Sequence, residues 1–140
     1  MPGPKLSPHW FTADLFLRMA EDEIYKSVRY SVPFAVVTAK LGFVNGGCDE
    51  YMEQFVESGL RQIDFAGKVS PDRYALGLPF TAAKGAEVVA VRLRLLLIEF
   101  NPIVGTAIAP DEGASIGSLL ASADRSAHEK AAQGRQQRSA

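Results

Sequence analysis

The stretch RQIDFAGKVSPDRYALGLP, residues 61–79, has the pattern of a strand, a turn and a second strand. Two runs rich in apolar residues, 65–69 and 73–79, flank a turn over residues 70–73. Pro71 takes the second turn position, where its fixed φ suits a type I turn. Arg61 and Asp64 lie three residues apart just before the first run. The stretch therefore predicts a β-hairpin preceded by a charged pair, which either forms an ordinary ion pair or binds a ligand.

Helical and extended segments alternate on both sides of this hairpin. The sequence predicts helices over residues 12–30, 50–62, 82–98 and 115–133, and strands over residues 34–43 and 102–109. In the first helix the expected N-cap is Thr12, and the expected buried row is Phe16, Ala20, Ile24 and Val28. This order of elements favours one mixed sheet with helices packed over it, an α/β or α+β sandwich.

The length of 140 residues fits one folded domain, which we expect over residues 12–133. Residues 1–11 are expected to be a flexible N-terminal segment, and residues 134–140 a flexible polar tail. The formal net charge of −1 gives no basic field, so DNA, RNA and anionic membranes are not expected partners. Arg92 and Arg94 interrupt the longest apolar run, so membrane insertion is not expected either. The first residues lack the apolar core of a secretory signal, and the expected location is the cytoplasm.

The sequence offers few candidate metal ligands. Cys48 is the one cysteine, which excludes an internal disulfide and a multi-cysteine zinc site. We expect it to be a small loop residue, because no motif pairs it with a base. His9 and His128 lie far apart without a carboxylate at ligand spacing. No metal site is therefore expected.

Five segments in a fixed order resemble one protein family. They are RYSVPFAVV (29–37), ESGLRQID (57–64), LGLPFTAAKGAEVVAVRLR (76–94), IVGTAIAPDEGAS (103–115) and LLASADRSAHEKAAQGR (119–135). Together they are similar to a GGDEF domain, the fold of bacterial diguanylate cyclases, from about Asp14 to Arg135. The resemblance implies a central mixed sheet flanked by helices, and a role in signalling by a bacterial second messenger.

The family's signature pentapeptide falls on residues 70–74, which here read SPDRY. The family has two glycines there for close approach of the nucleotide, whereas Pro71 adds a ring and removes an N–H donor. Arg73 puts a positive charge where the family has a metal-binding carboxylate. Ala39 and Leu41 fall at two aspartate positions of the family's first strand. The resemblance therefore implies a degenerate GGDEF domain that is not an enzyme, without catalytic residues or bound metal.

A second site of the family keeps its residues in this sequence. In the family, a product-binding site uses an RxxD motif five residues before the signature and an arginine on the next helix. Arg61, Asp64 and Arg92 fall at these positions, since Arg92 comes 31 positions after Arg61, as in the family. The implied ligand is cyclic di-GMP, without a cofactor. Arginine binds guanine O6 and N7 or a phosphate, and aspartate accepts from the guanine N1–H and amino group.

Two interpretations of function follow. The leading one is a catalytically inactive GGDEF-like receptor or effector that binds cyclic di-GMP and signals by changed protein contacts or by dimerisation. The alternative is a nucleotide-independent scaffold for protein–protein interaction, which predicts an exposed apolar patch around Trp10, Phe11 and Phe16. Trp10 can also be a packed N-terminal anchor. At the level of single residues, Arg61 and Asp64 can form an ordinary surface ion pair, and Arg92 can line the wet side of its helix.

Overall fold

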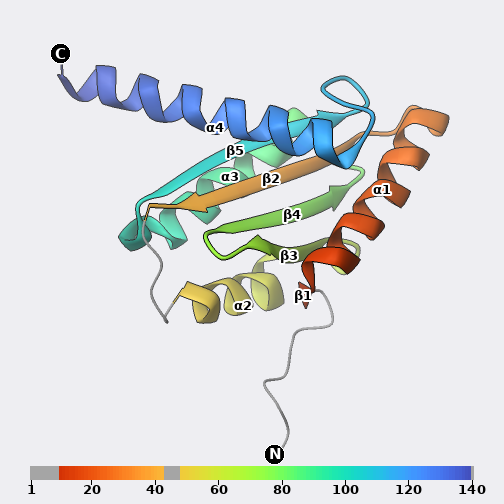
Figure 1. The fold of residues 1–140 in the computed structure, drawn as a ribbon, viewed down its shortest axis with the longest axis horizontal. Coiled ribbons are helices and arrows are strands. Elements are labelled where there is room, and N and C mark those ends of the chain that lie inside the picture. Colours follow the sequence, from red (N-terminus) through yellow and green to blue (C-terminus); the bar gives the residue numbers. More distant parts are fainter. Residues whose placement is uncertain (1–9, 43–47, 140) are drawn as a thin grey trace, which may run out of the picture.

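The computed structural model describes residues 10–42 and 48–139, the last six of them by their backbone alone. In chain order the elements are β1 (Trp10–Phe11), α1 (Ala13–Tyr30), β2 (Phe34–Leu41), α2 (Cys48–Gly59), β3 (Phe65–Ser70), β4 (Arg73–Pro79), α3 (Ala83–Leu96), the 3-10 turn η1 (Ile98–Phe100), β5 (Pro102–Ala109) and α4 (Ile116–Ser139). The described residues thus form a five-stranded sheet with four helices, the α+β sandwich that the sequence predicts (Figure 1).

The sheet is mixed, with the strand order β1-β3-β4-β2-β5. β2 lies between β4 and β5 and is antiparallel to both, β3 and β4 form an antiparallel hairpin, and β1 pairs in parallel with β3. The predicted hairpin is confirmed, because β3 ends at Ser70 and β4 begins at Arg73. Ser70 Oγ donates to Asp72 Oδ1 over 2.9 Å and closes the turn around Pro71.

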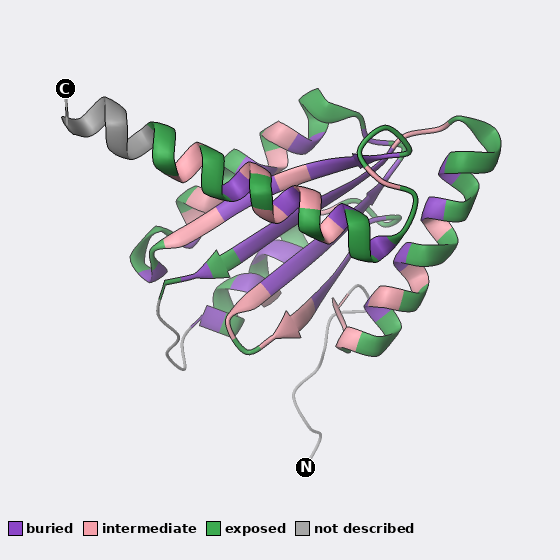
Figure 2. Ribbon diagram, turned by 45° about the horizontal axis from the view of Figure 1, so that its top comes forward, coloured by how far each residue is buried: buried purple, intermediate pink, exposed green. Residues whose placement is uncertain are grey.

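Helices cover both faces of the sheet: α1 and α4 lie on one face, and α2 and α3 on the other (Figure 1). Side chains along β2 point alternately to the two faces, as in any strand. Ala35 and Val37 therefore enter the core beneath α2 and α3, and Phe34 and Val36 enter the core beneath α1 and α4. Figure 2 shows the resulting pattern, with buried strands and with exposed residues on the outer sides of the helices.

α1 begins as predicted but buries a slightly different row. The Thr12 hydroxyl accepts a hydrogen bond from the Leu15 N–H over 3.3 Å, which confirms it as the N-cap. Phe16, Ala20 and Ile24 are buried. The prediction for Val28 is wrong: this side chain is 50% exposed, and Ser27 is buried in its place. Steps of four residues drift around a helix of 3.6 residues per turn, so the fourth buried position falls one residue earlier.

α2 begins and ends earlier in the chain than the sequence predicts. It spans Cys48–Gly59 rather than residues 50–62. Cys48 is therefore not a loop residue: it is the first residue of α2 and is buried against the core. Arg61 lies beyond the helix, in the loop before β3, where the Asp64 N–H donates to the Arg61 carbonyl over 3.0 Å. The loop is thus held by bonds of its own rather than by helical ones.

Helix or strand is formed on both sides of residues 12–133 as well. Trp10 and Phe11 form β1, and the Trp10 ring lies 5.7 Å from that of Tyr74, as expected of a packed anchor. The remainder of the predicted N-terminal segment, residues 1–9, lies outside the described residues. At the other end the backbone of α4 stays helical to Ser139, beyond the predicted helix end at residue 133.

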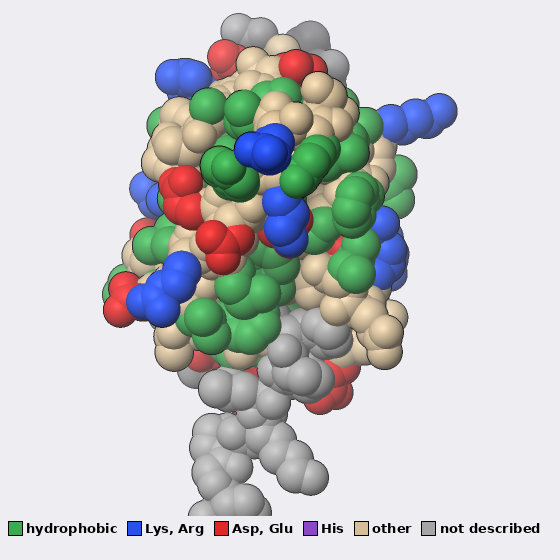
Figure 3. Space-filling model, turned by 90° about the vertical axis from the view of Figure 1, so that its right-hand side faces the viewer, with side chains coloured by type: hydrophobic (Ala, Val, Ile, Leu, Met, Phe, Trp, Pro, Cys, Tyr) green, Lys and Arg blue, Asp and Glu red, His purple; other side chains and the backbone are tan. Residues whose placement is uncertain are grey.

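The predicted apolar patch around Trp10, Phe11 and Phe16 is not formed. Phe16 is fully buried, and Trp10 and Phe11 are each partly buried and packed against the two cores. The physical reason is that β1 brings both aromatic rings onto the sheet instead of leaving them in solvent. On the face that α1 borders, exposed hydrophobic side chains are interrupted by acidic and basic ones (Figure 3).

Candidate ligand-binding site

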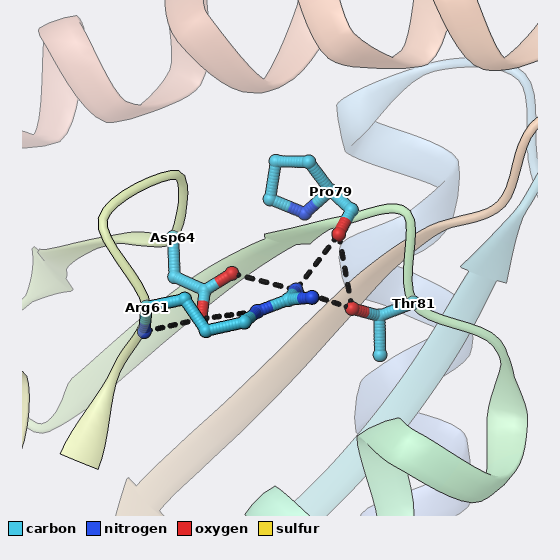
Figure 4. Close-up of polar contacts among 4 residues, drawn as sticks. All are labelled: Arg61, Asp64, Pro79 and Thr81. Carbon is cyan, nitrogen blue, oxygen red and sulfur yellow. Dashed lines mark hydrogen bonds and ion pairs between the residues drawn. The ribbon is translucent and has the colours of Figure 1, made fainter.

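Arg61 and Asp64 form a closely bonded pair in the loop between α2 and β3 (Figure 4). The Arg61 backbone N–H donates to Asp64 Oδ2 over 2.8 Å, and the side-chain Nε donates to the same oxygen over 3.1 Å. Arg61 Nη2 donates to Asp64 Oδ1 over 2.8 Å. Both carboxylate oxygens are therefore occupied by donors of one residue. This bidentate geometry is the strong form of a guanidinium–carboxylate contact.

The same guanidinium also reaches the end of β4. Arg61 Nη2 donates to the Pro79 carbonyl over 2.8 Å and to Thr81 Oγ1 over 2.7 Å, and Thr81 Oγ1 in turn donates to the Pro79 carbonyl over 3.0 Å (Figure 4). The Asp64 side chain is 4% exposed, whereas that of Arg61 is 52% exposed. The pair is thus a buried carboxylate covered by a half-exposed cation. It differs in this from an ordinary surface ion pair, in which both side chains are solvated.

Arg92 lies on the outer side of α3, beside the C-terminal end of α2. Its guanidinium carbon is 5.8 Å from the centroid of the Phe55 ring. A Cβ added to Gly59 would lie 3.4 Å from Arg92 Nη2, so the end of α2 and the Arg92 side chain approach each other closely there. Gly59 precedes Arg61 by only two residues. In the described hydrogen bonds, however, Arg92 contacts neither Arg61 nor Asp64. The structure joins the first two predicted site residues directly and places the third alongside the segment that leads to them.

The signature positions 70–74 lie at the tip of the β3–β4 hairpin and at the start of β4. Arg73 Nη2 donates to Asp124 Oδ2 over 2.7 Å and to the Leu120 carbonyl over 3.3 Å. Ala39 is fully buried and pairs with Tyr74 across the β2–β4 ladder. Among the described residues, no group of three or more His, Cys, Asp or Glu side chains is placed to hold a metal ion.

One polar cluster near the hairpin was missed by sequence reasoning. The buried Tyr74 hydroxyl donates to Asp49 in the first turn of α2, and Lys68 Nζ contacts the same carboxylate at 3.1 and 3.3 Å. Burial, followed by the bond to Asp49, raises the pKa of Tyr74, and burial raises the pKa of the neighbouring Cys48. Burial opposes ionisation of Asp49, but its bonds from Tyr74 and Lys68 together outweigh burial and lower the pKa. The sequence signal for this cluster was the tyrosine Tyr74 in the otherwise apolar run 74–79, because a buried tyrosine hydroxyl needs a hydrogen-bond partner.

Solved structures of GGDEF domains are similar to this chain in fold. The active GGEEF domain of a diguanylate cyclase from Vibrio cholerae matches with a TM-score of 0.72 at 13% identity, covering 86% of this chain and 90% of that one. The GGDEF domain of DgcB from Caulobacter crescentus, in complex with c-di-GMP, matches with a TM-score of 0.63 at 13% identity, covering 96% and 93%. Diguanylate cyclase SiaD of Pseudomonas aeruginosa, in complex with its activator SiaC, matches with a TM-score of 0.70 at 20% identity, covering 88% of this chain and 55% of that one.

No protein-family model matches the sequence, and no curated protein matches it. At these identities the structural likeness establishes the fold alone: the described residues have the fold of GGDEF domains, as the five sequence segments predicted. None of the described helices is both long and apolar enough to span a bilayer.

Proposed function

We propose that this chain is a catalytically inactive GGDEF-fold domain that binds cyclic di-GMP through Arg61, Asp64 and Arg92 and acts as a receptor or effector. The observation that supports it most is the Arg61–Asp64 pair, a buried carboxylate that is bonded on both oxygens by a half-exposed guanidinium. Arg92 lies beside the end of the helix that leads into this pair. Two cations and one carboxylate with these exposures suit a ligand that carries guanine and phosphate together.

Binding would proceed by exchange of partners at Asp64. The guanine N1–H and exocyclic amine present two donors in the same spacing as a guanidinium edge, so they can replace Arg61 on the carboxylate. The released guanidinium then stacks on the purine or bonds a phosphate, with Arg92 as the second cation. This exchange leaves no buried charge unpaired, which keeps the desolvation cost small. Adenine lacks this donor edge, so the pair would select guanine.

Loss of cyclase activity is the second part of the proposal. Pro71, Arg73 and Ala39 replace residues on which the family's phosphoryl transfer depends, and Arg73 is engaged by Asp124 on α4. A cation held at this place opposes the binding of a divalent metal ion. Incubation with GTP and Mg²⁺ that yields a cyclic dinucleotide would contradict this part.

Relatives in fold support the ligand class and the mode of signalling. One GGDEF domain was solved with c-di-GMP, another with the same dinucleotide in a novel interaction mode, and one diguanylate cyclase with its activator protein. We accordingly propose that ligand binding to this chain changes a protein contact, either with a partner or between two copies.

An isothermal calorimetric titration with cyclic di-GMP tests the proposal. We expect saturable heat with the native protein and none with cyclic di-AMP. Arg92→Ala should weaken binding about tenfold or more, since it removes one charged contact. Arg18→Ala is the matched control, because Arg18 is also an exposed arginine on a helix but lies on α1. Absence of heat with the native protein, or equal affinity for both dinucleotides, would refute the proposal.

A further inference from the structure

Phe80, which follows the last residue of β4, has a backbone conformation that phenylalanine rarely adopts. Its φ is 54°, in the left-handed region, where the Cβ of an L residue is crowded. Ser31 and Asn101 also have a positive φ, but each of them ends a helical element, which is an ordinary use of this region. Phe80 ends no helix, and its side chain is 65% exposed. Burial of the ring therefore does not offset the strain.

The residues on either side of Phe80 are both bonded to one guanidinium. Arg61 Nη2 donates to the Pro79 carbonyl over 2.8 Å and to Thr81 Oγ1 over 2.7 Å (Figure 4). Thr81 Oγ1 donates to the same Pro79 carbonyl over 3.0 Å. These bonds fix the chain immediately before and immediately after the strained residue. We call residues 79–82 the Phe80 turn, and the conformation that Arg61 fixes the held conformation.

The Phe80 turn leads directly into α3, whose first turn has no side-chain cap. The N-cap residue Ala82 makes no side-chain hydrogen bond to it. Thr81 packs on this first turn instead, since a Cβ added to Gly85 would lie 3.0 Å from the Thr81 methyl carbon. Ala82 and Ala83 also line a hollow of about 650 Å³, which leaves space beside the turn. A movement of Thr81 would therefore be passed on to the start of α3.

We infer that the Phe80 turn is a conformational switch controlled by the Arg61–Asp64 pair, an inference that rests on the proposed function. When the ligand takes Asp64 and the Arg61 guanidinium turns to the purine or a phosphate, Pro79 and Thr81 lose their donor. The strain at Phe80 then favours a return of its φ to negative values, which moves the exposed ring and the start of α3. The surface around Phe80 is thus where ligand binding would change a protein contact.

Two variants with opposite expected effects on affinity test the switch. Coupling between two sites is reciprocal, so a ligand that releases the turn binds more tightly to a chain whose turn is already loose. Thr81→Val removes the hydroxyl that accepts from Arg61 and keeps the side-chain shape, so the affinity for cyclic di-GMP should rise about threefold or more. Phe80→Gly adopts a positive φ without strain and favours the held conformation, so the affinity should fall about fivefold or more.

Isothermal titration calorimetry measures these affinities, and Thr81→Ser is the control. Serine keeps the hydroxyl, so this variant should bind cyclic di-GMP as the native protein does. Circular dichroism of each variant checks that the fold is retained. A purely structural role of the turn would give weaker binding for Thr81→Val, and this result would overturn the inference. Native affinity in both Thr81→Val and Phe80→Gly would also overturn it.

Hydrogen exchange of the backbone amides of residues 80–86 measures the turn itself. These amides include the Ala86 N–H, which donates to the Ala82 carbonyl over 3.0 Å at the start of α3. We expect exchange about threefold faster or more when cyclic di-GMP is bound to the native protein, and also in ligand-free Thr81→Val. Bound ligand with unchanged exchange here would overturn the switch and leave the proposed function standing. A native protein that does not bind cyclic di-GMP would refute the proposed function and the switch with it.

Discussion

Arg73 at the start of β4 is bonded to Asp124 on α4, with 2.7 Å between Nη2 and Oδ2. The arginine side chain is 21% exposed, and its Nε is buried without a partner among the described residues. A strand of the central sheet and the last helix are therefore tied together by a cation, at the position that the sequence resemblance aligns with a metal-binding carboxylate of the family.

Restoring the acid at this position should destabilise the domain without creating activity. In Arg73→Glu two carboxylates face each other, and we expect a loss of about 1–3 kcal/mol in the free energy of unfolding, measured with urea. No cyclic dinucleotide should form from GTP and Mg²⁺, because Pro71 and Ala39 remain. Asp124→Asn is the comparison, which should cost less because it leaves a neutral acceptor. Product formation by Arg73→Glu would contradict the account of this edge.

Removal of the Arg61 side chain should cost stability, even though half of that side chain is exposed. Asp64 is 4% exposed and would lose two of its three donors, which leaves a carboxylate buried and incompletely paired. We expect Arg61→Ala to lower the free energy of unfolding by about 2 kcal/mol. Arg18→Ala should change it by less than about 0.5 kcal/mol. Equal stability of the two variants would mean that the pair is an ordinary surface contact.

The Tyr74 hydroxyl should make the domain sensitive to alkali. Burial and the bond to Asp49 raise the pKa of Tyr74 above its usual value of 10.0, so the unfolded chain loses this proton first as pH rises. Its contribution is fully present below about pH 10 and declines above it. Tyr74→Phe should therefore reduce the decline of the unfolding free energy above pH 10. Part of the decline should remain, because burial also raises the pKa of Cys48. Tyr30→Phe, at a 64% exposed tyrosine, should leave the fall unchanged.

The close packing of α4 on β5 depends on a glycine. A Cβ at Gly105 would lie 2.0 Å from the Ala123 carbonyl oxygen, so α4 would have to move. We expect Gly105→Ala to lower the midpoint of thermal unfolding, with a cost of about 2 kcal/mol or more. Gly117→Ala in α4 is the control, because nothing lies within 4 Å of its added Cβ, and it should be neutral or stabilising. Similar midpoints for the two variants would contradict the packing described.

Sequence reasoning predicted the hairpin and the mixed sheet well because these depend on local patterns. Pro71 marks the turn, and β-branched and apolar runs mark the strands on either side. It failed where tertiary contacts decide: Val28 lies one residue past the buried position, and α2 ends before Arg61 because the loop bonds to Asp64 instead. The contact between Asp49 and Tyr74 spans 25 residues, and no local pattern indicates such a distant pair.

Asp64 is the residue proposed to recognise the guanine edge, and the affinity of Asp64→Asn for cyclic di-GMP tests this role most directly. Asparagine keeps the shape of the side chain but places an amide donor where the ligand also donates. Titration calorimetry should show binding weakened about tenfold or more relative to the native protein, with the fold retained by circular dichroism. Native affinity in Asp64→Asn would contradict the claim.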